Sequence, residues 1–164
     1  MSKLINNFSG AGAVTLTSAP AVTVGSTLYG ITITGEVLVG NQHRHDFLFG
    51  TSGNDDIVGG PRTDYLSGGR GDDVLTGGSS GPNAADVFSF KPGSGHDVIT
   101  DFQGQDEINI ARYLRHGDNV TVSDTGAGAV IDLGTGDTIT LLGVDSSQLV
   151  QTAHGFALGH LLVG

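Results

Sequence analysis

The chain has no cysteine, no tryptophan and a single methionine in 164 residues. Without cysteine no disulfide can form, an absence that fits an extracellular bacterial protein stabilised by other means. Aromatic residues make up only 6% of the sequence while glycine occurs 28 times, so we do not expect a conventional core of large interlocking side chains. The length is sufficient for one domain.

Basic residues and long apolar runs are also scarce. Lys and Arg total 7 against 17 Asp and Glu, which gives a formal net charge of −10. Nucleic acid is therefore not an expected partner, because it requires a basic stripe. No run approaches the ~18 apolar residues of a transmembrane segment, and the first residues, MSKLINNFSGAGAV, lack the apolar region of a secretory signal peptide.

The familiar catalytic motifs are missing as well. The sequence contains no His-Glu-x-x-His zinc motif, no Gly-x-Ser-x-Gly elbow and no phosphate-binding loop. His116-Gly117-Asp118 is explained by a turn, and His43 and His45 on one strand face are too few ligands for zinc or copper. We therefore expect exposed histidines and a protein that is not an enzyme.

What the sequence does contain is a nine-residue repeat. Four carboxylates occur at steps of nine, Asp46, Asp55, Asp64 and Asp73, and four aliphatic residues follow them at the same step, Leu48, Ile57, Leu66 and Leu75. The frame Gly-Gly-x-Gly-x-Asp-x-aliphatic-x is carried by GTSGNDDIV (50–58), GGPRTDYLS (59–67) and GGRGDDVLT (68–76). Glycine permits a tight turn, and the last three residues suit a short strand. Two nonapeptides would then make one flattened coil.

This frame resembles the calcium-binding nonapeptide of the RTX (repeats-in-toxin) proteins. The resemblance implies an all-β fold, a parallel β-roll in which each Ca²⁺ lies between turns n and n+2 on one side. Its ligands would be the Asp at position six and the carbonyls at positions two and four, in keeping with the six to eight oxygens that calcium takes. Carried over, several ions would be held by this set of residues: Asp46, Thr51, Gly53, Asp55, Gly60, Arg62, Asp64, Gly69, Gly71, Asp73, Gly78, Ala84, Asp86, Gly93, Gly95, Asp97, Asp101, Gly104 and Asp106.

The chain departs from the repeat at three places. Arg62 replaces the glycine at position four of the second repeat, and the turn before Asp46 contains no glycine. The segment GGSSGPNAADVFSF (77–90) carries four extra residues between Gly78 and Asp86, which we expect to form a loop. The segment PGSGHDVIT (92–100) then restores the frame, and Asp106 continues it.

The flanks of the proposed roll, residues 46–108, differ in pattern. Residues 1–45 contain AVTLT, AVTV, GITIT and EVLVG, whose alternation predicts strands. These form metal-free coils or a cap over the end of the roll, and an imperfect cap would allow end-to-end stacking. Residues 109–164 predict a C-terminal cap with a short helix at Ile110–Arg115 and antiparallel strands in NVTVS, GAVIDL and DTITLLGV. Their apolar end resembles the region near the RTX export signal.

The resemblance also implies a cellular setting. RTX proteins leave bacteria through a type I secretion machinery that reads an uncleaved C-terminal segment, and they fold where calcium is abundant. One hypothesis is a secreted structural, adhesive, matrix or surface-layer unit, extracellular or on the cell surface, which can assemble with itself. The other is the non-catalytic tail of a secreted metalloprotease, lipase or alginate epimerase that contacts polysaccharide. The native-looking start MSKLINN favours the first.

Overall fold

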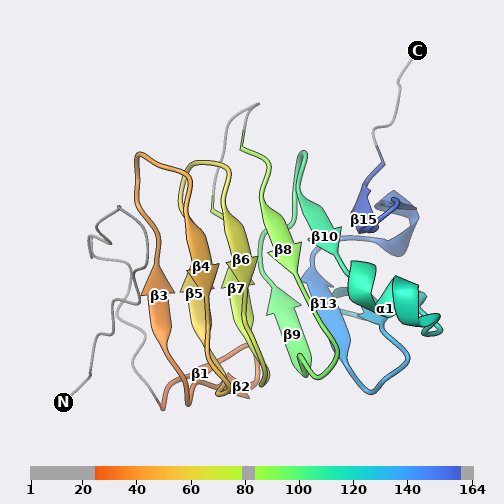
Figure 1. Cartoon of the computed structure of the whole chain (residues 1–164), viewed down its shortest axis with the longest axis horizontal. Helices are drawn as coiled ribbons and strands as arrows, with labels where there is room; N and C mark the ends of the chain where they lie inside the picture. Colours follow the sequence, from red (N-terminus) through yellow and green to blue (C-terminus); the bar gives the residue numbers. More distant parts are fainter. Residues whose placement is uncertain (1–24, 79–83, 160–164) are drawn as a thin grey trace.

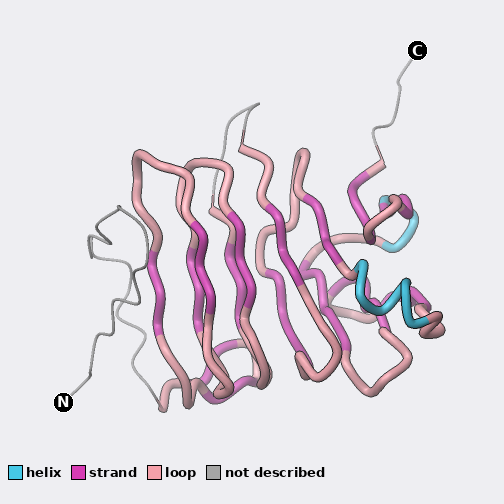
Figure 2. Tube along the Cα trace, viewed as in Figure 1, coloured by secondary structure: helices cyan, strands magenta, loops and turns pink. Residues whose placement is uncertain are grey.

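The computed structural model describes residues 25–78 and 84–159 (Figure 1). The expected strands AVTLT and AVTV, the centre of the expected insertion loop and the last apolar residues lie outside these ranges. Figure 2 shows that the regular structure consists mainly of short strands separated by turns. Within the two described ranges, no helix is long and apolar enough to span a lipid bilayer.

Two parallel layers of short strands form the body of the molecule. One layer contains β3 (Val37–Val39), β5 (Asp56–Val58), β7 (Val74–Thr76) and β9 (His96–Ile99). The other contains β4 (Phe47–Phe49), β6 (Tyr65–Ser67), β8 (Val87–Ser89) and β10 (Glu107–Asn109). The chain changes layer after each strand, as Figure 1 shows, so two repeats complete one coil. The predicted all-β parallel roll is confirmed.

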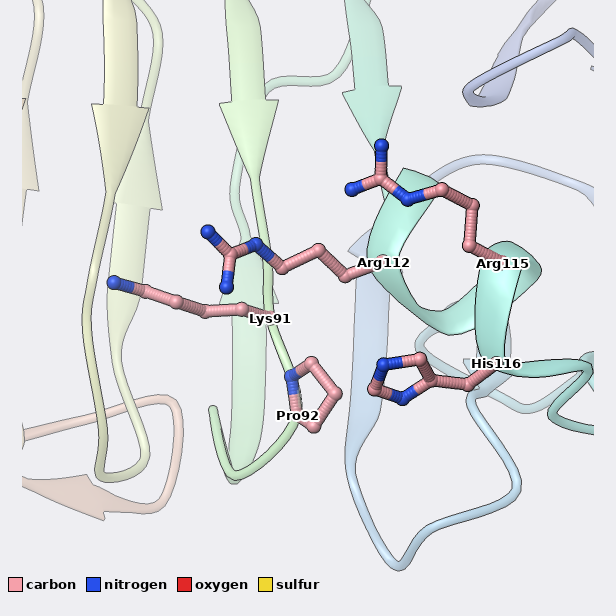
Figure 3. Close-up of a pocket in the computed structure, with 5 residues that line it drawn as sticks. All are labelled: Lys91, Pro92, Arg112, Arg115 and His116. Atoms are coloured by element: carbon pink, nitrogen blue, oxygen red, sulfur yellow. The ribbon is translucent and has the colours of Figure 1, made fainter.

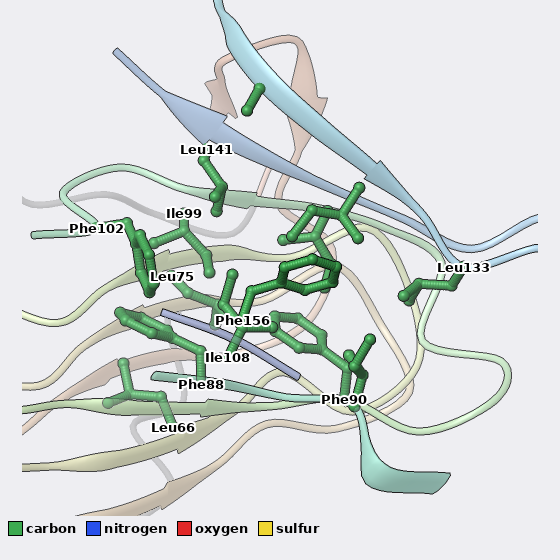
Figure 4. Close-up of a cluster of buried hydrophobic side chains, with 14 of the residues drawn as sticks. Leu66, Leu75, Phe88, Phe90, Ile99, Phe102, Ile108, Leu133, Leu141 and Phe156 are labelled. Carbon is green, nitrogen blue, oxygen red and sulfur yellow. The ribbon is translucent and has the colours of Figure 1, made fainter. Parts of the chain in front are cut away.

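The core of the roll follows directly from the repeat. Because corresponding positions of the repeats lie opposite one another, Ile57 pairs with Leu75 and Leu75 with Ile99. In the other layer Leu66 lies between Leu48 and Phe88. All of these side chains are buried. Figure 4 shows Leu66, Leu75 and Ile99 in one cluster with the rings of Phe88, Phe102 and Phe156. Burial of each such side chain contributes roughly 1.5–3 kcal/mol.

The C-terminal cap continues both layers with antiparallel strands. As predicted, β11 (Thr121–Asp124), β12 (Gly128–Asp132) and β13 (Thr138–Leu142) pair in antiparallel fashion. The strand β13 also pairs in parallel with β9, which the sequence did not predict. On the other layer, β15 (Gly155–Leu158) pairs with β10 and with β14 (Leu149–Gln151), which follows the short 3₁₀ helix η1 (Ser146–Gln148).

The short helix α1 (Ala111–His116) lies where it was predicted. It ends at Gly117, whose φ of 78° is the left-handed conformation that glycine adopts readily. Its buried residue, Tyr113, packs in the core and places its hydroxyl 2.8 Å from both the Lys91 carbonyl and Asp137 Oδ2. Burial raises the pKa of Tyr113, so the hydroxyl keeps its proton and acts as donor. The helix is thereby fixed to the roll.

The N-terminal part contains a small hairpin and one additional strand of the roll. The segment GITIT contributes β2 (Ile31–Thr32), which pairs with β1 (Thr27–Leu28) in antiparallel fashion. The segment EVLVG contributes β3, which stacks in parallel on β5 and extends the roll by one strand. His43 and His45 are exposed, as expected.

Candidate metal centre

A ladder of stacked aspartates runs along each side of the roll. On the first side, the backbone N–H of Asp55 donates to Asp73 Oδ1 at 2.9 Å, and that of Asp73 donates to Asp97 Oδ1 at 3.0 Å. These three residues are almost completely buried. Each carboxylate therefore uses one oxygen to hold the backbone of the turn before it.

The second ladder has the same construction with the other four repeat aspartates. The N–H of Asp46 donates to Asp64 Oδ1 at 2.7 Å, that of Asp64 to Asp86 Oδ1 at 2.8 Å, and that of Asp86 to Asp106 Oδ1 at 2.9 Å. Asp64, Asp86 and Asp106 are buried, and Asp46 at the N-terminal end is half-buried. The repeat thus places all seven aspartates on two lines, one on each edge, although extra residues interrupt the nine-residue spacing after Asp73.

Several aspartates of the two ladders have an Oδ2 atom that accepts no hydrogen bond. In the described part of the chain, Oδ2 of Asp64, Asp73 and Asp97 is buried without a hydrogen-bond partner. Burial raises the pKa of Asp64 to about 6 and that of Asp73 to about 8, and it raises the pKa of Asp97 well above the ordinary value. A buried, unpartnered carboxylate oxygen is costly, and a bound cation would remove this cost.

Backbone carbonyls of the turns lie against the next turn on the same side of the roll. A Cβ on Gly71 would lie 2.7 Å from the Gly53 carbonyl oxygen, and one on Gly69 would collide with the Thr51 carbonyl oxygen. Both glycines have positive φ, 107° and 115°. On the other side, the Gly60 carbonyl lies against Gly78 in the same way. The carbonyls at positions two and four of one turn therefore border the next turn on that side.

The donor set that results is one of oxygens alone. Within the described ranges, no group of three or more His, Cys, Asp or Glu side chains converges as a metal site. Carboxylates therefore need the turn carbonyls to complete a coordination shell, and such a mixed shell suits a hard cation of flexible geometry such as Ca²⁺. The residues present fit a calcium ion between successive turns.

Comparison with known families agrees with this chemistry. Residues 49–80 match the family model of the RTX calcium-binding nonapeptide repeat, in four copies. These residues are RTX repeats. A search of curated proteins gave no significant match to the chain. The RTX repeats and the stacked buried aspartates together imply Ca²⁺ binding, and such repeats are typical of secreted bacterial proteins.

Several predicted ligands lie in the turns beside the ladders. Gly93 and Gly95 belong to the turn before Asp97, Gly104 precedes Asp106, and Arg62 occupies an exposed position in the turn before Asp64. Ala84 directly follows residues 79–83, which are outside the described ranges. The assignment of individual carbonyls to individual ions stays a prediction.

Asp101 lies apart from both aspartate ladders. Its Oδ1 accepts the N–H of Gly77 and its Oδ2 that of Gly78, both at 2.8 Å. Each oxygen therefore already has a donor, unlike Oδ2 of Asp73. Asp101 thus fixes the backbone of Gly77 and Gly78, where the turn with the insertion begins. Its role as a calcium ligand stays a prediction.

Two features of the RTX roll escaped the sequence reasoning. A further ladder at position five links Asn54 Oδ1 to the N–H of Asp72 at 2.9 Å, and Asp72 Oδ1 to the N–H of His96 at 2.9 Å. Glu36 lies in line with Asp55 in the preceding coil, because Val37 pairs with Asp56. The N–H of Glu36 donates to Asp55 Oδ1. The spacing of Asn54 and Asp72, two repeats apart, was the available signal.

Asp137 is a third residue that the sequence reasoning missed. Its carboxylate accepts the N–H of Gly93 at 2.9 Å and that of Gly95 at 3.1 Å, from across the β13–β9 junction. Burial alone raises the pKa of Asp137, but hydrogen bonds from Gly93, Thr135, Tyr113 and Gly95 together hold it below the ordinary value. The segment GTGDTIT (134–140) repeats the Asp-x-aliphatic spacing of the nonapeptide, with Gly136 directly before Asp137, and this was the available signal.

The buried aspartates predict how the stability of the calcium-free chain depends on pH. Asp64, Asp86 and Asp73 have pKa values raised to about 6, 7 and 8 by burial, whereas in the unfolded chain Asp ionises near ~3.9. The folded state thus binds more protons, and the free energy of unfolding falls as the pH rises from about 4 to about 8. Circular dichroism in calcium-depleted buffer should therefore show more strand signal at pH 5 than at pH 8, where the chain is expected to be unfolded. A strand signal that increases with pH would contradict the burial of these carboxylates.

Proposed function

We propose that the chain is a secreted, non-catalytic RTX protein that folds when it meets extracellular calcium and then serves as a structural or adhesive unit. The observation that carries the proposal is the set of buried Oδ2 atoms without donors on Asp64, Asp73 and Asp97. Calcium sites of extracellular modules have a Kd of roughly 10⁻⁴–10⁻³ M, far above the free calcium of the cytosol. The chain would stay loose for type I export and become rigid outside.

An exposed aromatic cluster supports the adhesive role. Phe47 and Phe49 on β4 are 73% and 56% exposed. Their ring centroids lie 5.9 Å and 5.8 Å from that of Tyr65 on β6, so the three rings form one continuous surface. Contiguous exposed apolar patches on soluble proteins often mark interaction sites. This aromatic surface is a contact point for another molecule.

The strands at this end of the roll support self-assembly. Among the described strands, β4 pairs only with β6 and β3 only with β5, so each ends its sheet. A terminal strand offers unpaired backbone groups to another chain. A second copy stacked on this end would place one of its strands beside β4, next to the aromatic surface. A preceding domain of a larger secreted enzyme would use the same end, and this is the alternative function.

Sizing by light scattering tests assembly directly. We expect the wild-type chain to form larger species in millimolar calcium than in chelator, and the Phe47→Ser/Phe49→Ser double variant to stay monomeric. The control is Val150→Ser, which removes a side chain that is 47% exposed on β14, in the C-terminal cap, and should assemble like the wild type. A wild-type chain that remains monomeric at high concentration in calcium would rule out self-assembly.

A further inference from the structure

The scarce basic residues of this acidic chain gather at one pocket. Of 7 Lys and Arg residues in the sequence, three line a pocket of about 300 Å³ beside helix α1: Lys91, Arg112 and Arg115. The remaining lining residues are Pro92 and His116, so no acidic residue takes part. Figure 3 shows Lys91 and Arg112 extending in the same direction, with the His116 ring near Pro92. The pocket is a positive site on a chain of net charge −10.

These cations have no counter-charge within the described residues. Lys91, Arg112 and Arg115 are exposed, and no side-chain hydrogen bond or ion pair ties them to a neighbour there. The helix dipole explains basic residues in the last turn, where Arg115 and His116 lie. It does not explain Arg112 one turn earlier or Lys91 on the segment after β8. Grouping like charges costs free energy that an anionic ligand would offset.

The two walls of the pocket are fixed to each other. One wall is the segment Lys91–Pro92 and the other is α1, and the buried Tyr113 hydroxyl of α1 donates to the Lys91 carbonyl at 2.8 Å. The turn that follows Pro92 is held by Asp137, which accepts the N–H groups of Gly93 and Gly95. A preorganised cationic pocket binds an anion without first ordering its own backbone.

We propose that this pocket binds an oxyanion, a sulfate or carboxylate group. Arginine presents a planar fork of N–H donors that matches the oxygens of these groups, and lysine adds a point charge. Such a group is available as a free anion or as a substituent of an acidic polysaccharide. Because Gly93 and Gly95 also belong to the last turn of an aspartate ladder, the pocket forms only in the folded roll. The oxyanion site does not depend on the chain assembling with itself.

Isothermal titration of the full chain in calcium tests the site with two probes, sodium sulfate and a sulfated oligosaccharide. We expect Arg112→Gln and Arg115→Gln each to weaken binding by about tenfold or more, the loss of one charge-assisted hydrogen bond. Arg112→Lys should restore part of the affinity. Arg70→Gln is the matched control, because it removes the same charge from an exposed position outside the pocket and should change affinity by less than about twofold.

The outcomes separate the sources of the oxyanion. Binding of the oligosaccharide much more tightly than sulfate assigns the site to a polysaccharide, and equal binding per group assigns it to a free anion. The proposal is overturned if neither probe binds, or if Arg70→Gln weakens binding as much as Arg112→Gln does, since net charge alone would then be responsible. Circular dichroism in calcium verifies that each variant is folded.

Discussion

Removing calcium is expected to unfold the RTX roll and not merely to loosen it. Without a cation, the buried carboxylates of each ladder repel one another, and Oδ2 of Asp64, Asp73 and Asp97 has no partner. At calcium about tenfold above Kd, each site adds about 1.4 kcal/mol by linkage, so about four sites add on the order of 6 kcal/mol. This is comparable to the whole net stability of a domain, about 5–15 kcal/mol.

Far-UV circular dichroism during chelation and calcium titration measures this effect. The strand signal should disappear in chelator near neutral pH and return cooperatively as calcium is added. Magnesium is the matched control: it prefers rigid octahedral geometry and keeps its water, so the same concentration should restore little of the signal. Spectra that are identical with and without chelator would show that the roll is stable without calcium.

Asp73→Ala is expected to raise the calcium concentration needed for folding by about tenfold or more, the loss of at least one charge-assisted interaction. Asp73 is fully buried, its Oδ1 accepts the N–H of Asp55, and its Oδ2 is buried without a hydrogen-bond partner among the described residues. Asp73→Asn keeps an acceptor for Asp55 but removes the charge. A similar loss in both variants would show that the charge is what matters.

Asp118→Ala is the matched control for this prediction. Asp118 lies after α1, outside the repeats, and its Oδ2 is also buried without a hydrogen-bond partner among the described residues. Removing it should change the calcium midpoint by less than about twofold. If Asp118→Ala and Asp73→Ala shifted the midpoint equally, the assignment of ligands by repeat position would be wrong.

The repeat made the roll predictable because it encodes its own register. A nine-residue period places Asp55 next to Asp73 and Ile57 next to Leu75 without any information from distant residues. The helix α1 was likewise predictable, since Ile110, Tyr113 and Leu114 have helical spacing and Gly117 follows. In these regions the contacts join residues of the same repeat or of repeats two apart, so the local sequence pattern is sufficient to predict them.

The cap was less predictable because its partners are distant in sequence. Thr138 of β13 pairs with His96, and Ala157 of β15 pairs with Glu107. The sequence of neither strand indicates which strand it will pair with. The hydrogen bond between Gly93 and Asp137 also joins residues from different parts of the fold. The basic pocket arises from this same packing, because Lys91 and Arg112 meet only when α1 docks on the roll.

X-ray diffraction from crystals grown in millimolar calcium shows whether calcium ions occupy the gaps between the turns. We expect anomalous density for calcium between the turn at Thr51–Asp55 and the turn at Gly69–Asp73, next to Oδ2 of Asp73. Equivalent density is expected beside Oδ2 of Asp64 on the opposite edge. Gaps that contain only water, with both carboxylates hydrogen-bonded to it in a folded roll, would show that calcium is not what holds the turns together.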